Sequence, residues 1–274
     1  MFATAYKYAN RTLPPRVYRF LKFYRWCARF YLPRRIAAFF IRRTPRVRVF
    51  TAGNPNPQFV EQLLRTNVFA PTAMCRVMTR HGSDKGDGWH NYTTVYSSLF
   101  SNLRGRPLSI FELGLGTNNP NFAFGMGPAG RPGASLRGWR ELFPKALIFG
   151  ADIDHSILLK EDRINTYYCD QLDEVAIRNL WAHALLREGM DIIIDDGLHT
   201  FDGNTSFLER SLEQLRSGGF YIVEDISRHM IVKWTHQIDT IYLTRFPNYE
   251  FALVELPNSS NCCDNNLLII HRVR

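Results

Sequence analysis

Two apolar runs in the second half of the chain end in carboxylates. One run is followed by Asp195 and Asp196, with His199 three residues further on, and the other is followed by Glu224 and Asp225. Because parallel strands bring their carboxyl ends to the same edge of a sheet, we expect these acids to converge. An acid cluster with a histidine beside it is the kind of site that binds a metal ion and moves a proton.

We predict that Asp196, Glu224 and Asp225 bind a magnesium ion. Like charges this close repel one another unless a cation lies among them, and oxygen ligands favour a hard ion that keeps open positions for water or substrate hydroxyls. His199 is then the base that removes a proton from a hydroxyl acidified by the metal, so we assign His199 and Asp196 to catalysis. In the alternative interpretation these residues are a helix cap, an ordinary loop histidine and a solvated turn.

A second constellation, between residues 109 and 154, is typical of nucleotide binding. A short apolar run ends in Glu112 and the glycines Gly114 and Gly116, and a second run ends in Asp152. Glycines let the backbone turn sharply and approach a ligand closely, and an acid at the second strand end accepts both hydrogens of a ribose diol. Folds that bind NAD, FAD or S-adenosylmethionine share this arrangement.

The glycine spacing favours S-adenosylmethionine over NAD. The dinucleotide pattern G-x-G-x-x-G needs a third glycine where this chain has Asn119. We expect Asp152 to bind the ribose, and Asp170 with Gln171 to lie near the adenine at the third strand end. For each acid the alternative is a turn residue at the end of a strand.

These residues require a sheet whose strands end at one edge. The hydrophobic pattern predicts a doubly wound, Rossmann-like α/β fold of seven strands, in which helices separate the first five strands and the last two form an antiparallel hairpin at a sheet edge. The expected strands lie at 110–111, 147–150, 164–169, 191–196, 220–223, 250–256 and 266–273. The expected helices are 58–67, 92–100, 136–143, 173–188 and 204–216.

Two glycine-rich segments adjoin the expected site. Residues 117–135 form a long Gly/Pro/Asn loop, and a loop of that length inside a compact fold is often functional. Residues 81–100 are expected to form a loop and a helix, which we interpret either as a lid over the site or as a turn with a packing helix. The roles of His81 and His90 stay open.

Charge divides the chain into a basic N-terminal arm (1–50), a connector with lid helices (51–107) and a cofactor-binding domain (108–274). The arm holds thirteen Lys or Arg and no acid, so it carries +13, whereas the rest of the chain sums to −4. On a helical projection of residues 15–31, basic and apolar residues separate onto opposite faces. We expect residues 15–48 to bind an anionic membrane surface, with a solvated arm, a transit peptide or a nucleic-acid contact as alternatives.

The composition is that of a globular protein, and we expect a cytoplasmic one that is peripheral at the membrane surface. No apolar run reaches the ~18 residues of a membrane span, and arginines interrupt the N-terminal apolar stretches, unlike a signal peptide. The five cysteines follow no metal or disulfide spacing, so we expect reduced thiols at Cys27, Cys75, Cys169, Cys262 and Cys263. No nucleic-acid partner is expected, and a homo-oligomer stays open.

Taken together, the motifs resemble the class I S-adenosylmethionine-dependent methyltransferases. The strings E-x-G-x-G, GADID, CDQ, DDGLH and VEDI are more narrowly similar to the metal-dependent sugar O-methyltransferases of the macrocin and mycinamicin type and their relatives in bacterial polysaccharide clusters. The segments SDKG…H-x-Y (83–92) and GASLRGWRELFP (133–144) also fit that branch. The resemblance covers residues 75–230, roughly.

The resemblance implies a magnesium site at the three acids named above and a catalytic base at His199. It also implies contacts to S-adenosylmethionine at Glu112, Gly114, Ser135, Asp152 and Asp170. The chain departs from the macrolide enzymes at its N-terminus, where they carry an additional folded region and this chain has a basic arm.

We therefore predict a magnesium- and S-adenosylmethionine-dependent O-methyltransferase that acts on a sugar hydroxyl. The basic arm favours a surface polysaccharide or a lipid-linked glycan as the acceptor. The alternatives are a tailoring enzyme for an antibiotic or a catechol-like diol, and a membrane-associated scaffold without turnover. Hydroxylation would need an iron facial triad with two histidines, and the sequence indicates only one histidine beside the acids.

Overall fold

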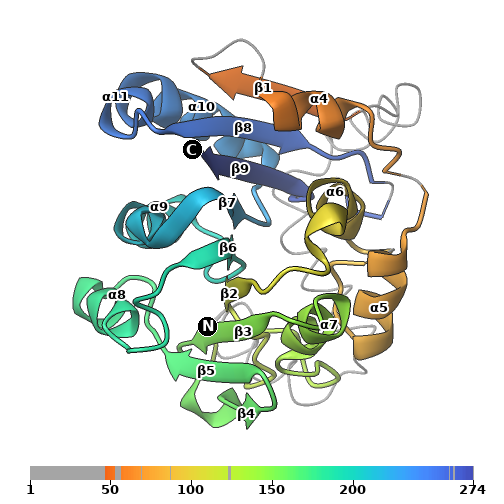
Figure 1. Ribbon diagram of the computed structural model, residues 1–274, viewed down its shortest axis with the longest axis vertical. Helices are drawn as coiled ribbons and strands as arrows, with labels where there is room; N and C mark the ends of the chain where they lie inside the picture. Colours follow the sequence, from red (N-terminus) through yellow and green to blue (C-terminus); the bar gives the residue numbers. More distant parts are fainter. Residues whose placement is uncertain are drawn as a thin grey trace, which may run out of the picture.

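A nine-stranded sheet runs through the part of the chain that the computed structural model describes, residues 47–52, 57–68, 70–86, 88–122, 125–258, 260–261 and 263–273 (Figure 1). Its strands are β1 (Arg48–Ala52), β2 (Ser109–Leu113), β3 (Leu147–Asp152), β4 (Lys160–Glu161), β5 (Ile164–Tyr168), β6 (Met190–Asp195), β7 (Leu215–Val223), β8 (Tyr249–Glu255) and β9 (Asn266–Arg272).

The strand order across the sheet is β1-β8-β9-β7-β6-β2-β3-β5-β4. The five strands β5, β3, β2, β6 and β7 are mutually parallel, so their carboxyl ends meet at one edge. The order reverses between β2 and β6, and such a switch point is where open α/β sheets bind their ligands. The topology therefore places a ligand site after β2 and β6.

The doubly wound Rossmann-like class is confirmed, but the expected count of seven strands is wrong. The two additional strands are β1 and β4, which pair antiparallel with β8 and β5 at the two sheet edges. The C-terminal hairpin does not simply extend the sheet, because β9 is inserted between β7 and β8 and β1 lies outside β8. The arm boundary expected at residue 50 falls inside β1.

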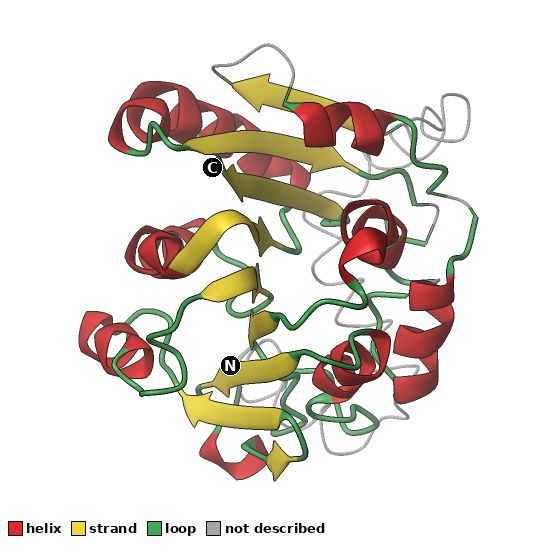
Figure 2. Ribbon diagram, in the orientation of Figure 1, coloured by secondary structure: helices red, strands yellow, loops and turns green. Residues whose placement is uncertain are grey.

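Helices cover both faces of the sheet (Figures 1 and 2). On one face lie α4 (Gln58–Leu64), α5 (Ala73–His81), α6 (Tyr92–Phe100) and α7 (Ala134–Leu142). On the other lie α8 (Glu174–Trp181), α9 (Phe201–Ser211), α10 (Ile231–Gln237), a π-helical turn (Ile238–Tyr242) and α11 (Leu243–Arg245). The helix α6 begins and ends where the sequence predicts, whereas α5, α10 and α11 were not anticipated.

Alternation along the central strands builds a core on each face. In β2, Ile110 packs with the α4–α7 side and Phe111 with the α8–α10 side, and in β6 Ile192 and Ile193 divide in the same way. Successive strand residues point to opposite faces, and strands buried on both faces read as continuous apolar runs. The first five apolar runs found in the sequence are therefore parallel strands that end at the ligand edge.

The first 46 residues lie outside the described part of the chain. The amphipathic helix expected at 15–31 therefore remains a prediction. Membrane binding by residues 15–48 also remains a prediction, and of that segment only residues 47 and 48 are described. Among the described residues, no helix has the length and apolar character needed to span a membrane.

Candidate functional site

A cavity of about 950 Å³ opens at the carboxyl ends of the central strands. It is lined by ten of the residues that the sequence assigns to the site: Gly114, Gly116, Ser135, Asp152, Asp170, Gln171, Asp196, His199, Glu224 and Asp225. Glu112 lies beneath this lining and is fully buried. One continuous cavity thus joins the expected nucleotide end to the acid cluster.

The two glycines after β2 are required by close backbone approach. Gly114 has φ +88°, and a Cβ built there would lie 2.1 Å from the carbonyl oxygen of Asp196. Gly116 has φ +77°, and its Cβ would lie 2.1 Å from the Met126 sulfur. Only a residue without a side chain lets the turn after β2 pass this close to the Asp196 backbone and to the loop that carries Met126.

Asp152 ends β3 beside this turn and is nearly buried. Its carboxylate accepts hydrogen bonds from the Leu115 amide at 2.7 Å and the Asp154 amide at 2.9 Å. Burial raises the pKa of Asp152, while those amide donors oppose the shift. Each carboxylate oxygen keeps a second lone pair, so the group can still accept the two hydrogens of a diol.

Gln171 is committed to the protein interior. Its amide nitrogen donates to both carboxylate oxygens of Asp195, at 2.8 and 2.9 Å, and its amide oxygen accepts from the Leu198 amide at 2.7 Å. The Asp170 carboxylate makes fewer hydrogen bonds within the described part of the chain, where it accepts one from the Leu172 amide at 2.9 Å. At the third strand end, Asp170 is therefore the better placed of the two for a ligand, and Gln171 fixes the loop after β6.

Glu112 is also fully engaged. One carboxylate oxygen accepts from the Ser135 hydroxyl and the other from the Trp139 indole nitrogen, both at 2.6 Å. The Lys85 ammonium lies 3.4 Å from the first of these oxygens. Glu112 thus anchors α7 and Lys85, and both Lys85 and Ser135 reach the cavity wall.

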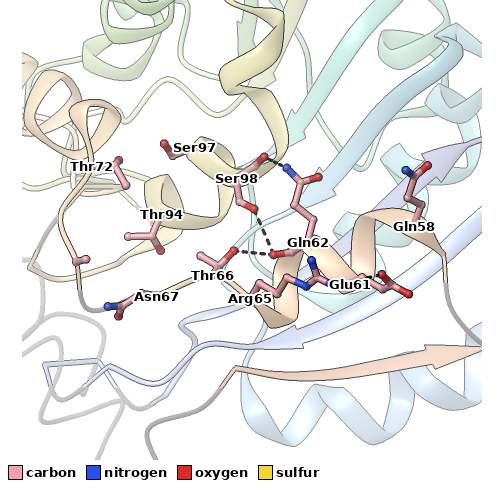
Figure 3. Close-up of a pocket in the computed structure, with 11 residues that line it drawn as sticks. Gln58, Glu61, Gln62, Arg65, Thr66, Asn67, Thr72, Thr94, Ser97 and Ser98 are labelled. Atoms are coloured by element: carbon pink, nitrogen blue, oxygen red, sulfur yellow. Dashed lines mark hydrogen bonds and ion pairs between the residues drawn. The ribbon is translucent and has the colours of Figure 1, made fainter.

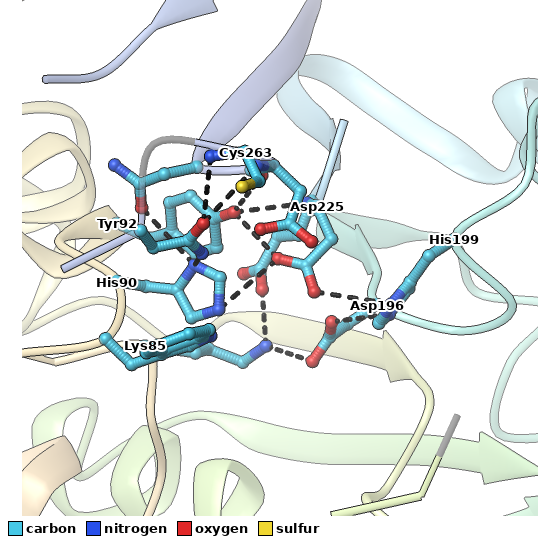
Figure 4. Close-up of polar contacts among 12 residues, drawn as sticks. Lys85, His90, Tyr92, Asp196, His199, Asp225 and Cys263 are labelled. Carbon is cyan, nitrogen blue, oxygen red and sulfur yellow. Dashed lines mark hydrogen bonds and ion pairs between the residues drawn. The ribbon is translucent and has the colours of Figure 1, made fainter. Parts of the chain in front are cut away.

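Asp196 and Asp225 face each other across the His199 imidazole (Figure 4). The ring nitrogen Nε2 lies 3.2 Å from Asp196 and Nδ1 lies 3.3 Å from Asp225. The candidate ligand atoms of these three residues all lie within 4.8 Å of one another, and each side chain is partly accessible from the cavity. Glu224 is not part of this triangle.

Lys85 connects Glu224 to Asp196. Its ammonium lies 2.5 Å from Asp196 and 2.6 Å from Glu224, and the side chain is only 2% exposed. Figure 4 shows the lysine reaching Asp196 from the side opposite His199. Burial alone would lower the pKa of Lys85, but the negative charges of Asp196, Glu112 and Glu224 outweigh it and raise that pKa. Lys85 is therefore a permanent cation at the centre of the cluster.

Side chains from the segment before β2 complete the cluster. The Tyr96 hydroxyl donates to Glu224, and the Tyr92 hydroxyl donates to Asp225 at 2.7 Å. His90 stacks on Tyr92 with ring centroids 4.6 Å apart, and its Nε2 lies 3.6 Å from Asp225. The expectation that only one histidine lies beside the acids is therefore wrong, because a Gly/Asp-rich loop carries His90 back over the sheet edge.

His81 lies away from the site. Its ring binds the exposed Glu141 at 2.8 Å on the surface between α5 and α7. The metal-like grouping among the described residues contains His199, while His90 contacts Asp225 from outside that grouping.

The charge state of the cluster follows from its contacts. Burial opposes the charged form of His199, but Asp225 and Asp196 outweigh it and raise the pKa of His199 to about 10. Burial would likewise raise the pKa of Asp196, yet the Lys85 and His199 charges hold it well below its usual range. Lys85 and His199 thus lie as cations beside Asp196, whereas burial raises the pKa of Glu224 and of Glu112.

The acid cluster meets the chemical requirements of a hard divalent cation. Asp196 and Asp225 each offer a carboxylate oxygen toward the same accessible space, and Glu224 lies one contact away through Lys85. Carboxylate oxygens with room for waters or substrate hydroxyls are the ligands that magnesium prefers. Asp196 and Asp225 therefore fit a hard divalent ion such as magnesium, whereas Glu224, the third expected ligand, is in contact with Lys85.

A second hollow of about 560 Å³ lies between α4 and α6 (Figure 3). Its walls are amides and hydroxyls, for example Gln62, whose side chain donates to the Ser98 carbonyl, and Thr66. Its lining holds one acid and one arginine, Glu61 and Arg65, which pair with each other. This hollow lacks the grouped titratable residues of the first cavity.

Sequence reasoning left segment 81–100 open as a lid over the site, but it assigned no site role to Lys85, Tyr92, Tyr96 or Trp139. The signal available was the segment from Ser83 to Tyr96, in which a lysine in a Gly/Asp loop precedes two tyrosines one helical turn apart. Local spacing does not reveal that such a segment folds over the carboxyl ends of strands formed later in the chain. Only the packing of α5 and α6 against the sheet shows this.

The fold and the site define a Rossmann-like α/β sheet with a glycine turn and an acid cluster at its ligand edge. Among solved structures, the chain is similar to a mycinamycin-pathway methyltransferase in complex with Mg, SAH and mycinamycin VI, with a TM-score of 0.56 at 23% identity. That match covers 74% of this chain and 55% of the other. At that identity the likeness shows the fold. No model of a protein family matches the chain.

The sequence relatives narrow the resemblance to sugar O-methyltransferases. The chain is 33% identical over 190 residues to 8-demethyl-8-(2-methoxy-alpha-L-rhamnosyl)-tetracenomycin-C 3'-O-methyltransferase of Streptomyces olivaceus. The matched region covers 69% of this chain and 46% of that protein. The chain is 31% identical over 150 residues to demethylmacrocin O-methyltransferase of Streptomyces fradiae, covering 54% and 35%. The chain thus spans less than half of these relatives, and the resemblance predicted from its motifs is confirmed.

Proposed function

We propose that the protein is a magnesium- and S-adenosylmethionine-dependent O-methyltransferase that acts on a sugar hydroxyl. The observation that carries the proposal is the single cavity that joins the glycine turn and Asp152 to the Asp196–His199–Asp225 cluster. Relatives named as sugar O-methyltransferases support the choice of reaction. A methyl donor at one end and an activated hydroxyl at the other is the arrangement that methyl transfer requires.

The nucleotide end divides into residues that touch the cofactor and residues that position them. Gly114, Gly116, Asp152 and Asp170 line the cavity with backbone or lone pairs left for a ligand. Three further residues act through their neighbours: Glu112 and Ser135 hold α7 against the cavity, and Gln171 fixes the loop after β6.

At the acid end, Asp196, Glu224 and Asp225 would hold magnesium, and His199 would accept the hydroxyl proton. Magnesium would supply charge neutralisation among the carboxylates and polarise the bound hydroxyl. His199 needs its neutral form to act as a base, and the carboxylates that now raise its pKa are the groups that a divalent ion would neutralise. Positioning and charge stabilisation are the main contributions of such a site.

For the acceptor we propose a surface polysaccharide or lipid-linked glycan. The support is the acid-free N-terminal arm with its thirteen basic residues, a composition that binds anionic membrane surfaces. The relatives favour a second candidate, a glycosylated small molecule, because they are named for tetracenomycin and macrocin glycosides. Both acceptors present the same chemistry, a sugar hydroxyl next to another oxygen that can share a metal ion.

The proposal is tested by titrating S-adenosylmethionine into the wild type and Asp152→Asn by calorimetry. We expect binding by the wild type and a loss of about 1.5–3 kcal/mol of binding free energy in the variant, the value of hydrogen bonds to a charged group. Methyl transfer to a panel of glycans and glycosides should then stop in EDTA and return with magnesium. A wild type that binds no S-adenosylmethionine would overturn the methyltransferase assignment.

The acceptor class is decided by a separate comparison. Vesicles of phosphatidylglycerol are mixed with the full chain and with a chain that begins at residue 47. Binding by the full chain alone would support a membrane-assembled glycan, and equal binding by both would sink that acceptor and leave the glycosylated small molecule.

A further inference from the structure

Lys85 is the least expected member of the acid cluster. A lysine is rarely buried to 2% exposure, because the removal of its charge from water is unfavourable unless partners surround it. Here three carboxylates surround the ammonium, and each one comes from the end of a different strand: Glu112 of β2, Asp196 after β6 and Glu224 after β7. These three strands are neighbours in the sheet.

The loop that carries Lys85 is built to hold it. The Lys85 carbonyl accepts hydrogen bonds from the Thr93 amide and the Thr93 hydroxyl, both at 3.1 Å, at the start of α6. The Ser83 hydroxyl accepts from the Lys85 amide at 3.3 Å. At Gly86, a Cβ would lie 2.5 Å from the Thr79 hydroxyl, so the loop packs tightly on α5. The ammonium therefore occupies a fixed position.

We propose that Lys85 is a built-in counter-ion, which holds Asp196 and Glu224 in place in the metal-free protein and competes with the divalent ion for these two acids. The inference rests on the proposed function only in taking Asp196 and Glu224 as metal ligands. Both oxygens of Glu224 already have donors, Lys85 on one and Tyr96 on the other. A divalent ion that binds Glu224 must therefore share a carboxylate that already carries the Lys85 ammonium, and two cations on one carboxylate repel each other.

The competition gives Lys85 a role in setting metal affinity. With the ammonium present, the acids are held together without metal, and the divalent ion binds against a neighbouring positive charge. Without it, Asp196 and Glu224 become uncompensated neighbours, and a divalent ion gains their full attraction. Loss of a merely structural residue would loosen the site and weaken metal binding, so the two roles predict opposite signs.

The test is calorimetric titration of magnesium chloride into the full chain and three variants. Lys85→Met keeps the length of the side chain and removes the charge, and we expect it to bind magnesium at least about tenfold more tightly than the wild type. Lys85→Arg keeps the charge and should stay within about threefold of the wild type. Lys145→Met makes the same change of net charge at an exposed position before β3, and its magnesium affinity should be unchanged.

Weaker or equal magnesium binding by Lys85→Met would overturn the inference, and so would an arginine variant that behaves like the methionine variant. Circular dichroism checks folding. If Lys85→Met is unfolded without metal, we expect excess magnesium to restore its fold, because the ion would then neutralise the acids in place of the lysine. A Lys85→Met protein that stays unfolded in excess magnesium contradicts the proposed competition.

The outcome also separates this inference from the proposed function. A wild type that binds no magnesium removes the metal from the proposed function, yet magnesium binding by Lys85→Met alone still supports the competing lysine. If neither protein binds magnesium, both the metal site and the competition are refuted.

Discussion

The hydroxyl of Tyr96 offers a direct measure of how strongly the segment before β2 stabilises the acid cluster. Tyr96 is fully buried, and its ring packs on Phe100 and Trp139 with centroids 5.6 Å from each. Its hydroxyl donates to Glu224, which is itself 1% exposed. Tyr96→Phe keeps the ring contacts and removes only the donor, so the change isolates one hydrogen bond to a buried carboxylate.

A hydrogen bond to a charged group contributes about 1.5–3 kcal/mol, and a buried acceptor left without its donor loses that full amount. We therefore expect Tyr96→Phe to lower the free energy of unfolding by about 1.5–3 kcal/mol. The measurement is urea denaturation in EDTA at neutral pH, with tyrosine and tryptophan fluorescence as the signal. Methyl transfer should fall by about 10–100-fold, as is usual when a partner of a metal ligand is removed.

Tyr249→Phe is the matched control. The Tyr249 hydroxyl donates to the neutral Leu212 carbonyl at 2.8 Å, and neither residue lines the cavity that holds the acids. Its loss should lower the free energy of unfolding by only about 0.5–1.5 kcal/mol and leave metal affinity unchanged. If Tyr96→Phe lowers the free energy of unfolding no more than Tyr249→Phe does, the hydrogen bond from Tyr96 does not stabilise buried Glu224.

Three further predictions follow from individual contacts. Gly114→Ala should lower the free energy of unfolding in urea by at least about 1–2 kcal/mol, because φ +88° is strained for alanine and its Cβ meets the Asp196 carbonyl. Gly105→Ala is the control, and it should change that free energy little because the space around Gly105 is open. His199→Ala should retain S-adenosylmethionine binding by calorimetry but lose methyl transfer by about 10²–10⁴-fold, and a variant that keeps its rate would remove His199 as the base. Burial raises the pKa of the Cys169 thiol to about 12, roughly four units above pH 8, so little of the reactive thiolate is present at that pH. Iodoacetamide should therefore label Cys169 slowly in the native protein and quickly once urea unfolds the chain. Fast labelling of the native protein would refute this.

The central fold could be predicted because its strands are buried on both faces. Apolar runs such as Ile192–Ile194 identify those strands directly, and a carboxylate after each run marks the ligand edge. The edge strands were not predictable in the same way. The strand β4 is two residues long, and β1 follows an arginine-rich segment, so neither has a run from which a strand can be recognised. Both form because an existing edge offers backbone partners.

The candidate site was predictable to the extent that it depends on strand ends. Asp196, His199 and Asp225 follow directly from β6 and β7, and the structure brings them within reach of one another. Lys85 and Tyr96 come from a segment more than a hundred residues before Asp196 and Glu224, and no spacing rule connects residues so far apart. Their contribution depends on tertiary packing, which sequence periodicity does not encode.

Backbone strain supplies the last element that the sequence conceals. His199 has φ 54° and Asp225 has φ 55°, left-handed values that are uncommon for residues other than glycine. Such a conformation is unfavourable by about 1–3 kcal/mol for each residue, and it persists only where the surroundings determine it. Glycine at either position would relieve the strain, but it would remove the imidazole or the carboxylate that the turn directs into the cavity. Because the two strained residues face each other at 3.3 Å, the strain falls at the contact on which the proposed proton transfer depends.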